Sequence, residues 1–312
     1  MITSRPCPTA SPSAEPIPEV AAPIVSISPQ AAALFHEQGF LMIRGFFEPE
    51  VVREVRAETE ALANETIERL GRAGKIADTC PGEPFETRLA LVSQRAGGID
   101  IGAVLRAELH RRGFFRLFFS RFLLDIVTGL IGPEVRLYPN YSIRPKLPDD
   151  EAMLVLWHQD AAYTASGAHG RDASADHDAD VLRMVNVWTP LVPATVENGC
   201  MQFIPGTHKL GIVPHQWKTR YYLEIETAWV ESRKAQIVDV EMNPGDVVLF
   251  SNMLFHQGLP NRTRGVRWSA DWRYQDATQS TLRTEKGHLA RSERRPDAVV
   301  RSADHWASLS FQ

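Results

Sequence analysis

Apolar positions recur at a helical spacing early in the chain and at a strand spacing later. Residues 48–71 repeat apolar side chains every three or four positions, with acidic residues at the start and Gly71 at the end, so they predict one long helix. A short helix is predicted over residues 28–39, where a serine precedes a proline and a glycine closes the segment. The apolar residues 40–43 then predict a buried strand.

The aromatic-rich residues 114–130 keep the helical period and predict one buried helix. Residues 75–113 favour no particular element. The first 22 residues are rich in Pro, Ser and Ala without a period, which is typical of a disordered lead. The chain is therefore divided into a lead at 1–24 and a single domain at 25–312, with a strand-rich core at about 134–275 and a C-terminal extension at 276–312.

From residue 134 the period shortens towards two. Short apolar or alternating runs, bounded by turn signals, predict strands over residues 153–157, 181–192, 201–204, 247–250 and 267–274. The domain is therefore predicted to be mainly β with helical additions. A further strand is predicted soon after residue 134, and in it Asn140 and Ser142 share one face. A polar face inside a barrel is costly unless it meets a polar ligand, so both are candidates for a cavity; a face exposed to water is the alternative.

Two of these strands end in residues that can bind a metal. His158-Gln159-Asp160 follows the first apolar run, and His256 follows another about a hundred residues later. Two imidazoles and one carboxylate form the facial triad of non-haem Fe(II) enzymes, which leaves open positions for a chelating co-substrate and dioxygen. An isolated His-x-Asp is also common on surfaces, and it is the placement at strand ends that favours a metal. Arg267 opens the next strand, where its guanidinium could hold a carboxylate.

Two features compete with this interpretation. His208 could replace His256 as the third ligand, but it falls on a predicted turn, so a structural or rim role is favoured. Residues 161–180 are rich in Asp, His, Gly and Ala. A second metal site there is conceivable, but a mobile loop over the mouth of the site fits this composition better.

These motifs resemble the phytanoyl-CoA dioxygenase family over about residues 29–275. The match rests on the ordered set His158-Gln159-Asp160, Val187-Trp188-Thr189-Pro190, Glu197-Asn198-Gly199-Cys200, Ile204-Pro205-Gly206-Thr207-His208, Pro244-Gly245-Asp246 and the interval from His256 to Arg267. The resemblance implies a double-stranded β-helix, a jelly roll or cupin-like barrel, flanked by N-terminal helices. It also implies Fe(II) on His158, Asp160 and His256, and the co-substrates 2-oxoglutarate and dioxygen. The residues it suggests for binding 2-oxoglutarate are Arg267, Trp188, Ser142, Gly258, Ser269 and Arg88.

Family chemistry implies oxidation of an unactivated C–H bond in a small-molecule substrate. Asp160 stands where related halogenases carry a small residue, so hydroxylation is favoured over halogenation. Desaturation, epoxidation and cyclisation stay open, as does an acyl-CoA substrate in place of a small natural product. A cupin-like binding module would lack a ligand or Arg267, and a zinc hydrolase would leave Arg267 without a role, so both are disfavoured.

Charge and cysteine content bear on the binding partners and the cellular location of the protein. A net charge of −4 over 312 residues gives no general attraction to nucleic acid or acidic membranes. The three widely spaced cysteines fit a reducing cytoplasm better than a disulfide framework. Neither a membrane-spanning run of about 18 apolar residues nor a secretory leader is recognisable. The sequence does not indicate the oligomeric state.

Overall fold

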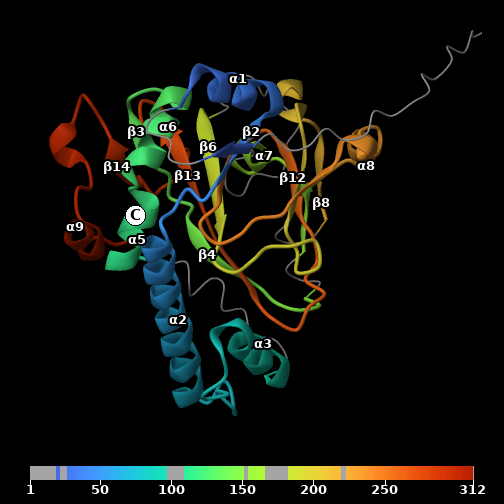
Figure 1. Cartoon of the computed structure of the whole chain (residues 1–312), viewed down its shortest axis with the longest axis vertical. Helices are drawn as coiled ribbons and strands as arrows, with labels where there is room; N and C mark the ends of the chain where they lie inside the picture. The colour runs from blue at the N-terminus through green and yellow to red at the C-terminus, as the bar shows by residue number, and fades with distance from the viewer. Residues whose placement is uncertain are drawn as a thin grey trace, which may run out of the picture.

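The computed structural model describes residues 19–21, 27–96, 109–150, 154–165, 182–218 and 223–311. Within these residues the chain forms three layers, with helices against one face of a large sheet and a smaller sheet against the other (Figure 1). The prediction of a mainly β domain with N-terminal helices is confirmed. Among the described residues no helix is long and apolar enough to cross a membrane.

The large sheet has eight strands, and its centre is the ten-residue strand β13. Its path runs β1-β2-β11-β6-β13-β3-β14, and β4 pairs with the first half of β13 beside that path. The strands are β1 (Glu19–Ala21), β2 (Phe40–Arg44), β3 (Val135–Leu137), β4 (Ser142–Lys146), β6 (Met184–Pro190), β11 (Val247–Ser251), β13 (Arg267–Asp276) and β14 (His288–Arg291). All described pairings are antiparallel except that of β1 with β2.

The small sheet has four antiparallel strands in the order β10-β7-β12-β5. They are β5 (Val155–His158), β7 (Met201–Ile204), β10 (Val238–Val240) and β12 (Phe255–Gly258). A separate two-stranded ribbon of β8 (His215–Trp217) and β9 (Leu223–Ile225) lies against β5. These strands come from distant parts of the chain, so the small sheet is held together by long-range pairings.

Several helices cover the face of the large sheet that is opposite the small sheet. The described helices are α1 (Pro29–Gln38), α2 (Pro49–Arg72), α3 (Phe85–Arg95), α5 (Arg112–Phe118), α6 (Arg121–Ile131), α7 (Asp160–Ala165), α8 (Thr227–Glu231) and α9 (Ala303–Ser308), with short 3-10 turns at Thr207–Leu210, Lys234–Gln236 and Pro296–Ala298. Val230 of α8 packs instead with Ile204 and Phe255 of the small sheet. Figure 1 shows α2, α5 and α6 on one side of the sheet and β12 and β8 on the other. Short α7 lies on the small-sheet side, because it directly follows β5.

Two apolar cores separate the layers. The larger core joins the helices to the outward face of β13, where Trp268 stacks on Phe85 at 4.8 Å between ring centroids. The smaller core lies between the sheets and holds Phe203 of β7 between Phe40 and Phe250 of the large sheet, each at 5.1 Å. Both faces of the large sheet are covered, so the polar residues that alternate with apolar ones along β13 are buried as well, on the face towards the small sheet.

Most predicted helix ends are confirmed, with two differences. The helix over residues 28–39 ends at Gly39, whose φ of 87° is the left-handed conformation that glycine tolerates best. The long helix continues one residue past Gly71. The single helix predicted over 114–130 is wrong, because the chain breaks at Ser120, whose hydroxyl accepts from the Leu123 N–H and starts a second helix. This break leaves Phe122 exposed.

Two predicted segments fall largely outside the described residues. The lead at 1–24 is described only at Glu19–Ala21, which forms β1 against β2. Of the predicted loop at 161–180, residues 161–165 belong to α7 and the rest lies outside the description.

Candidate metal centre and co-substrate site

Two histidines stand side by side on neighbouring strands of the small sheet. His256 on β12 is the direct cross-strand partner of His158 on β5, and their ring centroids are 4.0 Å apart. In each ring Nδ1 donates to the backbone carbonyl two residues earlier, at 2.7 Å to Leu156 and 2.9 Å to Leu254. Since Nδ1 carries the hydrogen, each Nε2 keeps a lone pair for a metal ion.

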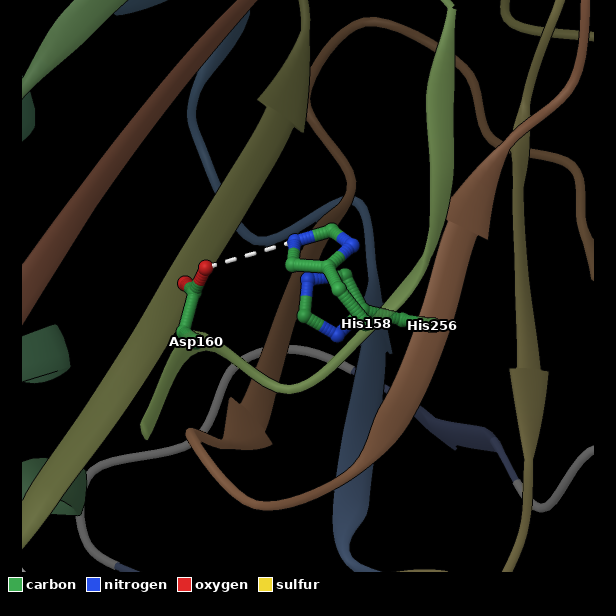
Figure 2. Close-up of side chains that lie close together, drawn as sticks. All are labelled: His158, Asp160 and His256. Atoms are coloured by element: carbon green, nitrogen blue, oxygen red, sulfur yellow. Dashed lines mark ion pairs between the residues drawn. The ribbon is translucent and has the colours of Figure 1, made fainter. Parts of the chain in front are cut away.

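Asp160 completes the group from the first residue of α7. Its Oδ1 lies 3.4 Å from Nε2 of His158, and one ligand atom from each of Asp160, His158 and His256 lies within 4.8 Å of the others. Figure 2 shows the carboxylate facing the two imidazoles. All three side chains are buried. Two neutral imidazoles and a carboxylate at this spacing suit a divalent transition metal with positions left open, and Fe(II) fits this donor set.

The charges at the site are arranged for metal binding. Burial is the largest single influence on the pKa of Asp160 and raises it, but Arg273, His158 and His256 together outweigh burial and hold the pKa well below its usual range. Burial, with a smaller contribution from His158, lowers the pKa of His256 to about 3. The carboxylate is therefore ionised and His256 neutral at physiological pH, which are the states that bind a metal.

The residue between the ligands fixes the loop that carries them. The Gln159 side chain donates to the carbonyls of Gly211 and Met253, at 2.8 and 2.7 Å, and accepts from the N–H of Val213. Its backbone N–H donates to Nε2 of His215 at 3.1 Å. These four hydrogen bonds connect Gln159 to Gly211, Val213, His215 and Met253. They therefore fix the backbone between His158 and Asp160.

A buried cation lies at the start of β13. Arg267 donates to Oγ of Ser269 at 2.5 Å and to the carbonyl of Gly199 at 3.1 Å, and its guanidinium sits 5.4 Å from the ring centroid of Trp188. Its Nε has no partner, and among the described residues no carboxylate pairs with it. Burial lowers the pKa of Arg267 to about 10, so it stays charged. A buried charge without a counter-ion is costly, so Arg267 is a candidate for binding an anion.

Lys146 adds a second cation directly opposite Arg267 in the pairing of β4 with β13. Its Nζ donates to the carbonyl of Gly258 at 3.4 Å, two residues beyond His256. Burial, helped by the charges of Arg267 and Arg144, lowers the pKa of Lys146 to about 7. Ser142, two residues before Arg144 on the same strand, is buried with an unpartnered Oγ. A dicarboxylate would meet several donors here.

Most residues proposed from the sequence thus gather in one place: the three ligands, Arg267 and its neighbours Ser269 and Trp188, and Gly258 with Ser142 on adjoining strands. Arg88 is different. It lies on α3 and donates to the carbonyl of Thr79 and to Asn64, so none of its described hydrogen bonds involves the site. Its contact with 2-oxoglutarate stays a prediction that this placement does not favour. His208 donates to the carbonyl of His36, outside the ligand group.

Sequence analysis overlooked three polar residues: Lys146, Arg273 and Asn186. Arg273 and Asn186 both donate to Oδ2 of Asp160. Their signal was the alternation along strands, since Lys146 continues the face of Ser142, and Arg273 that of Arg267 and Ser269. Alternation identifies the face, but the register between strands is needed to identify the partners.

Comparison with known sequences gives a family match over most of the chain. The family model for phytanoyl-CoA dioxygenase (PhyH) matches residues 35–269. A probable phytanoyl-CoA dioxygenase of Caenorhabditis elegans is 29% identical over 211 residues, which are 59% of this chain and 63% of the worm protein, less than two thirds of its length. The 1-deoxypentalenic acid 11-beta-hydroxylase of Streptomyces arenae is 28% identical over 257 residues, 78% of this chain and 80% of that one.

Comparison with solved structures supports the same fold. The crystal structure of EctD from S. alaskensis with 2-oxoglutarate and 5-hydroxyectoine aligns with a TM-score of 0.54 and 22% identity, covering 81% of this chain and 77% of that chain. At this identity the likeness shows a shared fold, which agrees with the two facing antiparallel sheets.

Proposed function

This chain belongs to the phytanoyl-CoA dioxygenase family of Fe(II)- and 2-oxoglutarate-dependent oxygenases, and from that premise we propose that it hydroxylates an unactivated C–H bond of a small metabolite. The observation that carries the proposal is the pairing of two sites. His158, Asp160 and His256 offer a metal three ligand atoms, and Arg267 on the facing sheet offers a buried charge to a carboxylate. A binding module without turnover has no need of both.

His158, Asp160 and His256 would hold Fe(II), which would supply the chemistry by which dioxygen gives one oxygen atom to 2-oxoglutarate, forming succinate and carbon dioxide, and the other to the substrate. The protein side chains would position 2-oxoglutarate and exclude water from the site. Arg267 would hold the far carboxylate of 2-oxoglutarate, and Lys146 and Ser142 would add donors beside it. Trp188 would form an apolar wall over which the guanidinium of Arg267 is already placed.

The ligand set favours hydroxylation over halogenation, because Asp160 is present and is held by Arg273 and Asn186. A halide would need the space that this carboxylate fills. Desaturation, epoxidation and cyclisation depend on the pose of the substrate, and product analysis separates them.

One matched relative supports a small natural product as the substrate class. The 1-deoxypentalenic acid 11-beta-hydroxylase of Streptomyces arenae aligns over 78% of this chain and 80% of its own length. An acyl-CoA ester is the second candidate, because several of the matched relatives bear the phytanoyl-CoA dioxygenase name. The location we propose is the cytoplasm, which agrees with the free thiols of the buried Cys80 and Cys200.

The test is succinate formation from 2-oxoglutarate by protein loaded with Fe(II) anaerobically and then exposed to air. Candidate small metabolites and acyl-CoA esters are added in separate reactions, and the products are identified by mass spectrometry. Iron-dependent succinate that rises with one substrate class, together with a product heavier by one oxygen atom, supports the proposal. A protein that neither forms succinate nor binds 2-oxoglutarate in the presence of the metal contradicts it.

A further inference from the structure

Four charged side chains form a chain of contacts that ends on the metal-binding carboxylate. We name Arg144, Asp271, Arg273 and Asp160, in this order, the ion-pair relay. Arg144 of β4 pairs with Asp271 of β13 through two of its nitrogens, one of them 3.2 Å from Oδ1. Nη1 of Arg273 lies 3.1 Å from the same Oδ1. The relay therefore crosses the inner face of the large sheet and reaches the small-sheet side at Asp160.

All three nitrogens of the Arg273 guanidinium are in use. Nε and Nη2 both donate to Oδ2 of Asp160, at 3.0 and 2.7 Å. Nη1 donates to Asp271 and to the carbonyl of Asn140, the latter at 3.1 Å. A planar guanidinium fixed at three corners cannot rotate or slide, so the position of Asp160 Oδ2 is set from the large sheet.

This arrangement makes the two oxygens of Asp160 unequal. Oδ2 accepts three hydrogen bonds, two from Arg273 and one from Asn186 at 3.0 Å. Three donors use the directions in which a carboxylate oxygen accepts. Oδ1 instead faces His158, at 3.4 Å from Nε2. Only Oδ1 is left to bind a metal ion.

We propose that Arg273 is a positioning residue that restricts Asp160 to a single metal-bound oxygen, and thereby keeps a coordination position open for the co-substrates. The proposal rests on the proposed function, because the open position matters only to an oxygenase. Asp271 and Arg144 assist by holding the guanidinium from behind. Arg273 reaches the metal only through Asp160.

If Arg273 only neutralised the charge of Asp160, any positively charged side chain at this position would be enough. A lysine would also neutralise the buried carboxylate, but its single ammonium nitrogen cannot replace the two converging bonds to Oδ2 and also reach Asp271 and the carbonyl of Asn140. The proposal therefore separates Arg273→Lys from Arg273→Gln: the first keeps the charge and loses the fork, and the second loses both.

The experiment measures Co(II) binding to the metal-free full chain, because Co(II) takes the same donors as Fe(II) and its visible absorption depends on coordination number. The variants are Arg273→Gln, Arg273→Lys and Asp271→Asn. The control is Arg136→Gln on β3, a half-buried arginine that donates to Gln275, Gln279 and Ala277 and has no described contact with the ligands. Affinity and the absorption coefficient at saturating Co(II) are recorded for each protein.

We expect Arg273→Gln to bind Co(II) about 10- to 100-fold more weakly, and to show an altered visible spectrum per bound ion because a second carboxylate oxygen replaces a water ligand on the metal. Arg273→Lys should recover much of the affinity and keep the altered spectrum. Asp271→Asn should change the spectrum in the same direction by less, and Arg136→Gln should match the parent protein.

An unchanged saturated spectrum in both Arg273→Lys and Asp271→Asn overturns the proposal, even if affinity falls, because Arg273 would then act as a counter-charge only. These two variants decide the matter if Arg273→Gln does not fold. Since Co(II) binding needs no turnover, the result is independent of succinate formation. A parent protein that binds Co(II) but neither forms succinate nor binds 2-oxoglutarate contradicts the proposed function and leaves this test intact.

Discussion

The small sheet and the large sheet hold their functional side chains in different ways. On the small sheet, His158 and His256 are oriented by their own backbone, since each Nδ1 bonds a carbonyl two residues earlier in its strand. On the large sheet, Arg273 and Asp271 are oriented by other side chains, in contacts that cross from strand to strand and from sheet to sheet. One set is placed locally and the other by the whole fold.

The difference teaches which residues tolerate which changes. A locally oriented histidine keeps its direction as long as its strand is intact, and loses only its own function when replaced. A residue of the ion-pair relay shares its partners, so its replacement displaces neighbours as well. The predictions that follow test this contrast, beginning with the largest expected effect.

Replacing His256 by Ala should abolish measurable metal binding, with affinity reduced by at least about 100-fold, because one of three ligands is lost. The fold should persist, since neighbouring strands still pair along β12. Isothermal titration with Co(II), alongside thermal unfolding of the metal-free protein, measures both. His208→Ala is the matched control, and equal loss in that variant would mean that the ligand has been misassigned.

Replacing Arg267 by Ala should weaken 2-oxoglutarate roughly 30-fold or more, as expected for one partner of a buried ion pair. Metal binding without the co-substrate should change little, because Arg267 has no described contact with the three ligands. Titration of 2-oxoglutarate into the Co(II) protein measures the effect. If Arg267→Ala lost metal affinity instead, Arg267 would also support the metal ligands, and its role would not be limited to binding the co-substrate.

Replacing His215 by Leu should weaken Co(II) binding about tenfold. The N–H of Gln159 would lose its acceptor, and the loop between the two ligands would lose one of its attachments. His215→Gln offers a carbonyl oxygen at a similar reach and should restore part of the affinity. If His215→Leu binds metal as the parent does, the remaining bonds of Gln159 suffice to place the loop.

The smallest effect concerns pH. Burial lowers the pKa of Lys146 to about 7, so its ammonium is charged below that pH and neutral above it. The affinity for 2-oxoglutarate should therefore fall by up to about tenfold per pH unit as the pH rises past 7, since a cation near the carboxylate is lost. Lys146→Met should bind more weakly at pH 6 and show a flatter profile. Identical profiles for parent and variant would exclude Lys146 from the anion site.

The same contrast explains how much the sequence could reveal. The histidines and Asp160 follow predicted strands within a few residues, so the pattern of apolar runs was enough to single them out. Arg267 and Ser269 alternate along one strand, and their shared face was predictable too. These residues depend on local structure, which a single sequence encodes most directly.

The residues that were missed depend on register. Lys146 is recognisable only when β4 is known to lie beside β13 with Lys146 opposite Arg267. Arg273 and Asn186 face each other across β13 and β6, and meet Asp160 only because the small sheet packs against them. The break at Ser120 was missed for another reason: the aromatic period continues through it, and a single capping hydroxyl changes the outcome.

Strand β13 has a consequence for engineering. All ten of its residues are buried, and its two faces are committed to different tasks. On the face towards the helices, Trp268 donates to the carbonyl of Phe85 and Tyr274 donates to that of Phe118. These bonds attach α3 and α5 to β13. A mutant library should therefore leave β13 unchanged. In the β8–β9 ribbon, variation is better confined to exposed positions such as Gln216 and Trp217, because His215 holds the loop between the two ligands.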